Sequence, residues 1–593
     1  MAAPAIFVHD PGEYRLTDPG TVVALTASAF EACKRAGLSP TVLDDHTKRP
    51  EFCRNPDAYQ RWQLDWLNRL DAACQLNGVA PSCAHLMVPP VDSLVMTARM
   101  LAGAVDTLAP ESITYVGKVG PVEATGFHNG HLQFWPSLGD APLAGRLLPM
   151  IARARSLTYD ARPVDGPAPA GRPPQHLLAC ARREVSRTLG PSRRVYRRHI
   201  KRRTHRSTTL MLWYAGYGAD QFAADERSAG RDTAFITRGG ASFRIVDPGL
   251  PPSHAPGRRI DLNVRPVTAL DPALTSLLEE VDDWAGVPGA SRILQSRLAV
   301  FLHGICVTVA DAARRAQRDL AAFAIERVAA ANPSSLEEFA CLNAARAAGI
   351  PRMLVQHGDH LLAYGFWLVM ETVNFEELAA SDPTMGDELT AAATRLGVVA
   401  PRVTYFAPRI RALLEGARSH RRLAQGEGPI CYLPAFFLGD SRYVSGCNFD
   451  DAWYHRWHLR ILDLMGTRPD LRFIWKGLPS SDQAVDPIPS IIAERGLRHV
   501  AYETRPFTKV VSEVDRIFTD FPSTALYESV HLGKPVLAVT FPRFFSVRPT
   551  AAARFAQVLR ECDTEEQALA QISDFLDGDP NLWVLPEENL AIP

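Results

Sequence analysis

Short apolar runs alternate with segments of helical periodicity through most of this 593-residue chain. Residues 5–10 (AIFVHD) and 41–45 (TVLDD) are typical of strands, and residues 21–40 between them space their apolar side chains as a helix does. Strands that are joined through helices pair in parallel, with helices packed on both faces of the sheet. The alternation therefore predicts an α/β fold made of doubly wound, Rossmann-like units.

The second half of the chain continues this alternation on both sides of a polar stretch. Residues 298–324 are expected to form a long helix, and residues 325–332 the strand after it. Residues 413–428 (LLEGARSHRRLAQGEG) lack apolar periodicity, which is typical of an interdomain linker. We expect an N-terminal domain over 1–412 and a C-terminal domain over 429–593. Ligands of such sheets bind at the carboxyl ends of the strands, so a central cleft between the two domains is the expected site.

Charge and cysteine content exclude several classes of protein. Lys plus Arg is 64 and Asp plus Glu is 65, which is not the basic balance of many nucleic-acid-binding chains. The ten cysteines include no C-x-x-C pair, so we expect neither a disulfide framework nor a zinc ribbon, and a reducing compartment. The first residues lack the pattern of a signal peptide. The apolar stretch 298–313 is short and contains His303, so we expect a buried helix there and a cytoplasmic protein.

One local charge anomaly lies in the N-terminal domain, in a basic insertion near 180–206. Eleven Lys or Arg and a single acid, Glu184, lie between Arg182 and Arg206. Many such runs are simply solvated surface, but anionic lipid attracts basic clusters at about 1 kcal/mol per residue. Two interpretations stay open: a solvated face, or contact with an anionic membrane surface or another polyanion. Nucleic acid fits poorly, because the chain has no recognisable nucleic-acid-binding fold.

The strongest local signal is the stretch IFTDFPSTALYESVHLGKPV at 517–536. An apolar strand runs into Asp520, and Ser523 and Thr524 then precede a helix. Free N–H groups and the helix dipole make such an N-terminus an anion site. Glu528, four residues after Thr524, can accept hydrogen bonds from ribose hydroxyls. The stretch fits a nucleotide phosphate site, and the alternative is an ordinary N-cap within a βαβ turn.

The block D-x-P-S-T-x-x-x-E-x-x-x-x-G-K-P-V within this stretch resembles the donor-domain signature of GT-B glycosyltransferases. It is most similar to the bacterial surface-carbohydrate group that includes capsule Kdo transferases and teichoic-acid glycerophosphotransferases. Three further stretches resemble that group in the same order: residues 326–358 ending in QHG, 431–440 (CYLPAFFLGD) and 471–481 (LRFIWKGLPSS). The resemblance implies a GT-B fold, with a nucleotide-activated donor held by the C-terminal domain and an acceptor held by the N-terminal domain. It also implies no tightly bound cofactor and no metal.

His357 and Asp359 are the candidate catalytic residues. His357 lies at a strand end that would face the cleft, and Asp359 is two residues further on. A histidine beside a carboxylate suits removal of a proton from an acceptor hydroxyl. The alternative is a loop histidine bonded to the backbone. His357 and His360 as metal ligands would lack a third ligand at a suitable spacing, so we expect no metal.

Positive and hydroxyl side chains at other strand ends complete the candidate donor site. Arg409 corresponds to a strand-end arginine of the resembling group, and Lys476 ends an apolar strand. Both are expected to face donor phosphates. The full candidate donor-binding set is Arg409, Lys476, Ser480, Asp520, Ser523, Thr524 and Glu528.

The expected function is a glycosyltransferase that moves a sugar from a CMP-, CDP- or UDP-linked donor to a surface polysaccharide or polyprenyl-linked glycan. Such an enzyme would be cytoplasmic and peripheral on the inner face of the membrane. Two alternatives stay open: a CDP-polyol phosphotransferase of the same fold, and a catalytically inactive scaffold of a polysaccharide assembly complex. Leu478, where the resembling group has histidine, and Ala435, where it has threonine, favour the scaffold.

Overall fold

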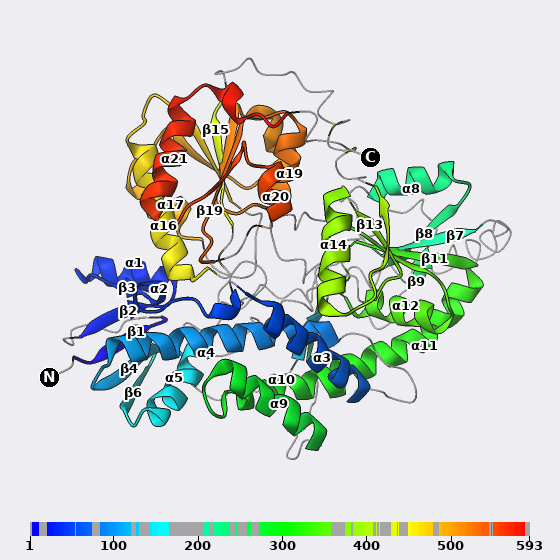
Figure 1. Ribbon diagram of the computed structural model, residues 1–593, viewed down its shortest axis with the longest axis horizontal. Helices are drawn as coiled ribbons and strands as arrows, with labels where there is room; N and C mark the ends of the chain where they lie inside the picture. Colours follow the sequence, from blue (N-terminus) through cyan, green and yellow to red (C-terminus); the bar gives the residue numbers. More distant parts are fainter. Residues whose placement is uncertain are drawn as a thin grey trace, which may run out of the picture.

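The computed structural model shows three large, mainly parallel sheets within the part of the chain that it describes (Figure 1). This confirms the expected fold class, an α/β architecture of doubly wound units. The described residues are 3–10, 20–53, 55–73, 84–119, 126–129, 142–164, 207–212, 219–237, 244–246, 258–261, 272–331, 333, 335–356, 374–380, 383–406, 411, 414, 428–435, 437, 449–477, 486–544, 547 and 549–586.

The first sheet has the strand order β3-β2-β1-β4-β6, with every pair parallel. Residues 21–40, expected to be one helix, begin instead with strand β2, because the run TVVA is β-branched and pairs with β1. The helix α1 starts only after Thr26, whose side chain caps it. The strands are β1 Ala5–Val8, β2 Thr21–Ala24, β3 Thr41–Val42, β4 Ser112–Gly117 and β6 Thr158–Pro163, and the helices are α1 Ala27–Arg35, α2 Leu43–His46, α3 Asp57–Ala73, α4 Val88–Leu108 and α5 Leu143–Ala154.

The second sheet has the order β14-β13-β12-β11-β7-β8-β9 and is parallel except for β9. The described part of residues 1–412, expected to be one domain, therefore contains two large sheets and one small antiparallel pair. Alternation predicts strands but not which strands pair, so it could not reveal this division. The strands are β7 Thr208–Leu212, β8 Asp232–Thr237, β9 Arg244–Val246, β11 Ile325–Ala330, β12 Arg352–Val355, β13 Glu377–Ala380 and β14 Arg402–Tyr405. The helices are α8 Ala219–Ser228, α12 Leu336–Ala347 and α14 Pro383–Leu396. A separate antiparallel pair joins β5 Gly126–Asn129 to β10 Arg258–Asp261.

The third sheet lies within residues 429–593 and has the order β17-β16-β15-β18-β19-β20, all parallel. Successive side chains alternate between its faces: Tyr432 and Phe518 pack with α16 and α21, whereas Cys431 and Ile517 pack with α19 and α20. The strands are β15 Ile430–Leu433, β16 Phe473–Lys476, β17 Val500–Glu503, β18 Arg516–Thr519, β19 Val536–Thr540 and β20 Leu559–Glu561, and the helices are α16 Asp451–Gly466, α17 Ile488–Glu494, α18 Phe507–Val510, α19 Thr524–His531, α20 Pro549–Arg554 and α21 Glu565–Asp577.

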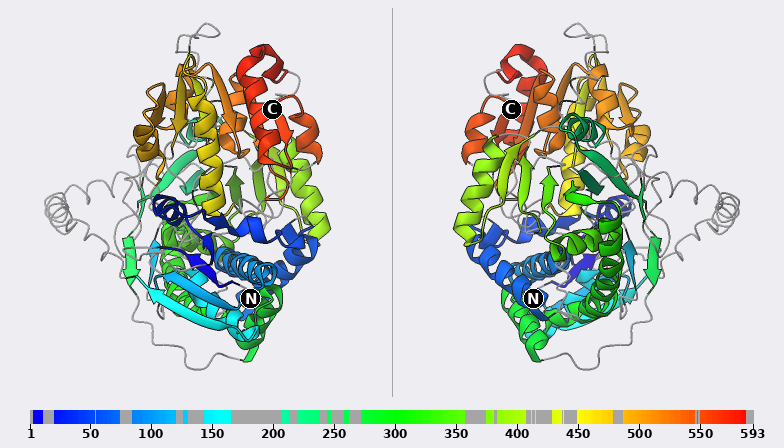
Figure 2. Two further views of the ribbon diagram at one scale, coloured as in Figure 1. Left: turned by 90° about the vertical axis from the view of Figure 1, so that its left-hand side faces the viewer. Right: turned by 90° about the vertical axis from the view of Figure 1, so that its right-hand side faces the viewer.

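The first and third units share one apolar cluster, which includes Ile6, Phe30 and Trp453. Figures 1 and 2 show the third unit lying over the first, with α16 reaching down to α1. Because α16 follows the carboxyl end of β15, this edge of the third sheet is turned toward the first unit.

The expected helix at 298–324 belongs to a longer helical segment, Ala290–Ala322, which includes a π-helical turn at Phe301–Cys306. By length and composition this segment could cross a membrane, but 67% of its most apolar stretch is buried within the protein. Its last part, α11 Val307–Ala322, packs along α12. The expectation of a buried helix is thus confirmed. The basic residues 182–206 lie outside the described part of the chain.

Candidate functional site

The candidate site lies at the carboxyl edge of the third sheet, where the strand order reverses. β15 lies between β16 and β18, so successive crossovers leave it in opposite directions. Doubly wound sheets bind their ligands in the crevice outside such a switch point. Lys476 is the last residue of β16 and Asp520 directly follows β18. The structure thus brings these two expected residues to one sheet edge.

Asp520 is fully buried and is held by three side chains of β15 and α16. Its Oδ1 accepts a hydrogen bond from Tyr454 Oη at 2.9 Å, and its Oδ2 accepts bonds from Tyr432 Oη and, at 2.8 Å, from Trp457 Nε1. Burial raises the pKa of Asp520 to about 6, although the three donors favour the charged form. Because both oxygens have protein donors, this carboxylate fixes the loops at the switch point. A direct contact between Asp520 and the nucleotide-activated sugar stays a prediction.

Helix α19 begins at this edge with the two expected hydroxyl residues. Ser523 is the N-cap in an extended conformation, and its Oγ accepts a hydrogen bond from the backbone N–H of Ala525 at 3.4 Å. Ser523 and Thr524 are both half-buried, so the first turn of α19 remains partly accessible. Glu528, by contrast, is 1% exposed. The helix N-terminus thus lies where an anion site was expected, whereas the ribose contact of Glu528 stays a prediction.

Lys476 lies at the same edge but is largely buried. Its ammonium group donates a hydrogen bond to the carbonyl oxygen of Gly477, and burial lowers its pKa. A Cβ atom at Gly477 would lie 2.1 Å from Tyr502 Oη, so only glycine fits the turn that follows β16. This close approach holds the backbone of Gly477, which follows Lys476, against Tyr502 of the neighbouring strand β17.

A small cavity lies between the carboxyl ends of β1 and β2 and the N-terminus of α16. Its volume of about 30 Å³ has room for about one or two water molecules. Its polar walls are His9, directly after β1, Thr26, Arg49 and Asp450, the N-cap of α16. The N-terminus of α16 therefore meets the carboxyl edge of the first sheet at this cavity.

His9 is a residue of this region that the sequence interpretation missed. Its backbone N–H donates to the carbonyl of Val116 in β4 at 2.9 Å, and its own carbonyl accepts from Thr26 Oγ1 at 2.8 Å. His9 is thereby fixed between β1 and β4, at the switch point of the first sheet. The signal was present in the sequence as a histidine and an acid, His9 and Asp10, at the end of the first apolar run.

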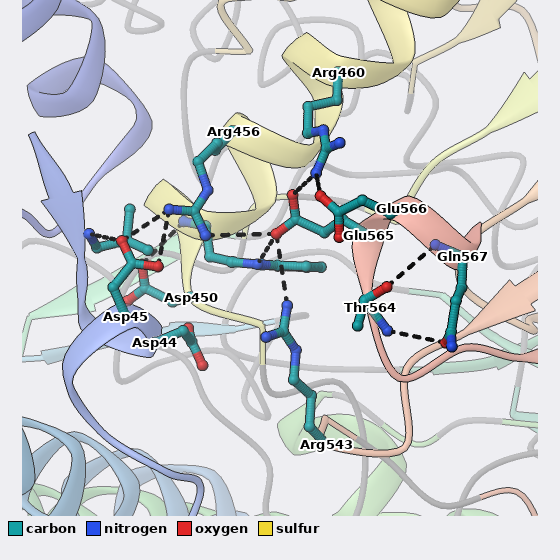
Figure 3. Close-up of polar contacts among 12 residues, drawn as sticks. Asp44, Asp45, Asp450, Arg456, Arg460, Arg543, Thr564, Glu565, Glu566 and Gln567 are labelled. Carbon is teal, nitrogen blue, oxygen red and sulfur yellow. Dashed lines mark hydrogen bonds and ion pairs between the residues drawn. The ribbon is translucent and has the colours of Figure 1, made fainter. Parts of the chain in front are cut away.

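Helix α16 makes the contact between the two units. Its aromatic side chains Trp453 and Trp457 are fully buried, as expected of an amphipathic helix. Two polar residues of α16 contact the first unit. His455 Nε2 lies 2.8 Å from Glu31 Oε1. Arg456 Nη1 lies 2.8 Å from Asp45 Oδ2 (Figure 3). The hydrogen bond with His455 holds the pKa of Glu31 below its usual value. These two polar contacts hold α16 against the first unit.

The remaining expected residues, His357, Asp359, Arg409 and Ser480, lie outside the described part of the chain, as does Leu478. Ala435 is described, and its backbone N–H donates to Tyr454 Oη at 2.6 Å. Within the described ranges, no group of three or more His, Cys, Asp or Glu side chains is placed to hold a metal ion.

Comparison with known proteins gives only distant likenesses. No family model matches the sequence, and no curated protein matches it. Among solved structures, the UDP-GlcNAc 2-epimerase from Neisseria meningitidis bound to UDP-GlcNAc is 13% identical, with a TM-score of 0.38, over 65% of this chain and 94% of that chain.

Two further solved structures match to a similar degree. MurG from Acinetobacter baumannii is 14% identical, with a TM-score of 0.33, over 65% of this chain and 94% of its own. A glycosyltransferase from Rickettsia africae ESF-5 is 10% identical, with a TM-score of 0.34, over 65% and 93%. TM-scores this low do not define a reaction, so the fold class depends on the sheet topology itself.

Proposed function

We propose that the chain is a GT-B type glycosyltransferase that uses a nucleotide-activated sugar and extends a surface polysaccharide or a lipid-linked glycan. One observation carries the proposal: the carboxyl edge of the third sheet, with its switch point and the N-terminus of α19, is turned toward another α/β unit. Doubly wound sheets bind nucleotides at such an edge. An accessible helix N-terminus there is suited to a phosphate group.

In this proposal, catalysis comes from positioning and electrostatics. The free N–H groups at the start of α19 would stabilise the charge that develops on the departing nucleotide phosphate. Lys476 at the end of β16 would add a positive charge if the edge rearranges on binding. His357 and Asp359 would remove the proton of the acceptor hydroxyl, and Arg409 and Ser480 would contact the donor.

The proposed setting of the enzyme is the cytoplasmic face of a membrane. A polyprenyl-linked acceptor would be held at that surface, and the basic residues 182–206 would bind anionic lipid. The proposed donor is CMP-, CDP- or UDP-linked. A CDP-polyol phosphotransferase would use the same helix N-terminus, and the identity of the bound nucleotide separates the two reactions.

A second candidate, an inactive scaffold, is favoured by the burial of the acids expected to contact the donor. Glu528 is 1% exposed, and both oxygens of Asp520 are held by protein donors. Acids used in this way stabilise the fold whether or not a nucleotide binds. The scaffold therefore predicts a folded protein without nucleotide affinity.

The deciding experiment is calorimetric titration with CMP, CDP, UDP and GDP. Ser523→Gly removes the hydroxyl, while glycine remains a tolerated N-cap residue. We expect one nucleotide to bind selectively and Ser523→Gly to weaken it about tenfold. Asp579→Gly, at the N-cap of the 3-10 turn Pro580–Trp583 in the same unit, is the matched control and should leave affinity unchanged. Absence of binding by folded wild-type protein would favour the scaffold.

A further inference from the structure

A polar groove lies on the α16 and α21 side of the third unit (Figure 3). Its volume is about 390 Å³, within the range of small-molecule sites. The groove differs from the α19 site, because α19 packs on the opposite face of the sheet. Its lining residues are Arg456 and Arg460 of α16, Arg543 after β19, and Asp563, Thr564, Glu565 and Glu566 at the start of α21.

Two of the three arginines have carboxylates at hydrogen-bond distance. Arg460 Nη1 donates to Glu565 Oε2 at 2.9 Å and to Glu566 Oε1 at 2.8 Å. Arg456 donates to Asp45 at 2.8 Å and lies 3.5 Å from Glu565. These contacts place guanidinium groups along the wall of the groove and leave their charges largely compensated.

Arg543 differs from both. Its nearest carboxylate in the described part of the chain is Glu565 at 3.7 Å, which is beyond hydrogen-bond distance, and its Nε is buried with no hydrogen-bond partner. The guanidinium group lies over the rings of Trp453 at 4.8 Å and Phe544 at 4.7 Å, and 33% of the side chain remains exposed. Burial lowers the pKa of Arg543, and Asp44 and Glu565 oppose this only in part. The groove therefore contains a fixed cation with no hydrogen-bonded counterion.

We propose that this groove binds an anionic sugar, whose phosphate or carboxylate group meets Arg543 and whose hydroxyls face Asp563 and Glu566. A planar guanidinium group that is held by stacking presents its N–H donors in a fixed direction, which suits an oxyanion. Carboxylates accept hydrogen bonds from hydroxyls, so the acids of the groove select a polyhydroxylated anion over a bare one. The inference goes beyond the proposed transfer reaction and does not depend on it.

Calorimetric titration of the full chain with inorganic phosphate, glucose 1-phosphate, glucuronate and glucose tests this directly. We expect glucose 1-phosphate or glucuronate to bind, inorganic phosphate to bind more weakly, and glucose not to bind. Arg543→Met, which keeps the length of the stem over the rings, should weaken binding at least tenfold. Arg468→Met is the matched control, because Arg468 pairs with the exposed Asp577 at 2.7 Å in the same unit, and it should leave affinity unchanged.

A second variant keeps the test decisive if Arg543→Met fails to fold. Glu565→Gln removes the charge that competes for Arg543 but keeps an oxygen to accept from Trp453 Nε1, which donates to Glu565 at 2.8 Å in the wild type. It should raise the affinity for the anionic sugar about fivefold. The proposal is overturned if neither anionic sugar binds, if Arg543→Met binds as well as the wild type, or if Glu565→Gln does not tighten binding. Nucleotide binding at α19 should be unchanged in both variants, so the groove and the α19 site are tested independently of each other.

Discussion

Tyr454 joins two loops that are far apart in the sequence: its hydroxyl donates to Asp520 Oδ1 at 2.9 Å and accepts from the backbone N–H of Ala435 at 2.6 Å. Ala435 follows β15 and Asp520 follows β18, the two strands at the switch point of the third sheet. One hydroxyl thus fixes both walls of the expected nucleotide crevice. The contact places the expected Asp520 beneath the site.

Tyr454→Phe should destabilise the protein by about 2–3 kcal/mol, because it leaves a buried carboxylate oxygen and a backbone N–H without this partner. Urea unfolding measures the change. Tyr502→Phe is the control: Tyr502 is half-buried and donates only to Asp486, at 2.6 Å, so we expect a loss of about 1 kcal/mol. Equal effects of the two substitutions would contradict the bridging role of Tyr454.

Asp520 should make stability depend on pH between 4 and 6. Its pKa is about 6 in the folded protein and 3.8 for an unperturbed carboxyl, so the folded state retains a proton that the unfolded state releases. Wild-type stability should therefore fall by about 1.4 kcal/mol per pH unit as the pH rises through this window. Asp520→Asn has no carboxyl group that titrates at this position. Urea unfolding at pH 4 and pH 6 should therefore show that the free energy of unfolding of the wild type falls relative to that of Asp520→Asn. If the free energies of unfolding of the two proteins differed by the same amount at both pH values, the raised pKa of Asp520 would be refuted.

His458 should give the opposite trend. Its ring is buried against Tyr432, Tyr454 and Trp475, and neither ring nitrogen has a hydrogen-bond partner among the described residues. Burial lowers the pKa of His458 well below 6.5, so only the unfolded state takes up a proton as the pH falls below that value. Wild-type stability should thus fall from pH 7.5 to pH 5.5 more steeply than that of His458→Phe, by about 1.4 kcal/mol per unit below pH 6.5. Parallel curves for the two proteins would exclude a buried neutral imidazole.

The sequence predicted the strands β1, β11 and β18, where an apolar run stood between turn residues. At residues 41–45 only Thr41–Val42 form the expected strand, and helix α2 follows at once. The prediction failed at residues 21–40, where helical spacing hid the β-branched run of β2 that pairs with β1. It also could not divide residues 1–412 into two sheets, because parallel pairing joins strands that are distant in the chain.

The position of Asp520 followed from local pattern alone, because a polar residue after a buried strand must lie at the sheet edge. Its partners did not, since Tyr432 and Trp457 come from elements about sixty or more residues away. The groove around Arg543 was hidden for the same reason: Arg456 and Glu565 lie 109 residues apart in the chain and meet only in the folded unit. Local sequence patterns thus predicted which residues lie at strand ends, but not the sites that form where distant helices meet.

Arg49 and Asp44 form a buried ion pair of the first unit at its interface with the third unit. Their side chains are 2% and 4% exposed, with Nη2 and Oδ2 3.0 Å apart, and the Arg49 guanidinium lies 4.9 Å from the Phe544 ring of the third unit. Arg49→Met should cost about 3–5 kcal/mol, because Asp44 would remain as a buried charge without its hydrogen-bonded partner. The double variant Arg49→Met/Asp44→Asn should recover most of that loss, since it leaves no buried charge. A double-mutant cycle by urea unfolding measures the coupling, with the exposed pair Arg495 and Asp463 as the control, expected to couple by about 0.5 kcal/mol. If the double variant were as unstable as Arg49→Met, the loss would come from the packing of Arg49 on Phe544 and not from the charge of Asp44.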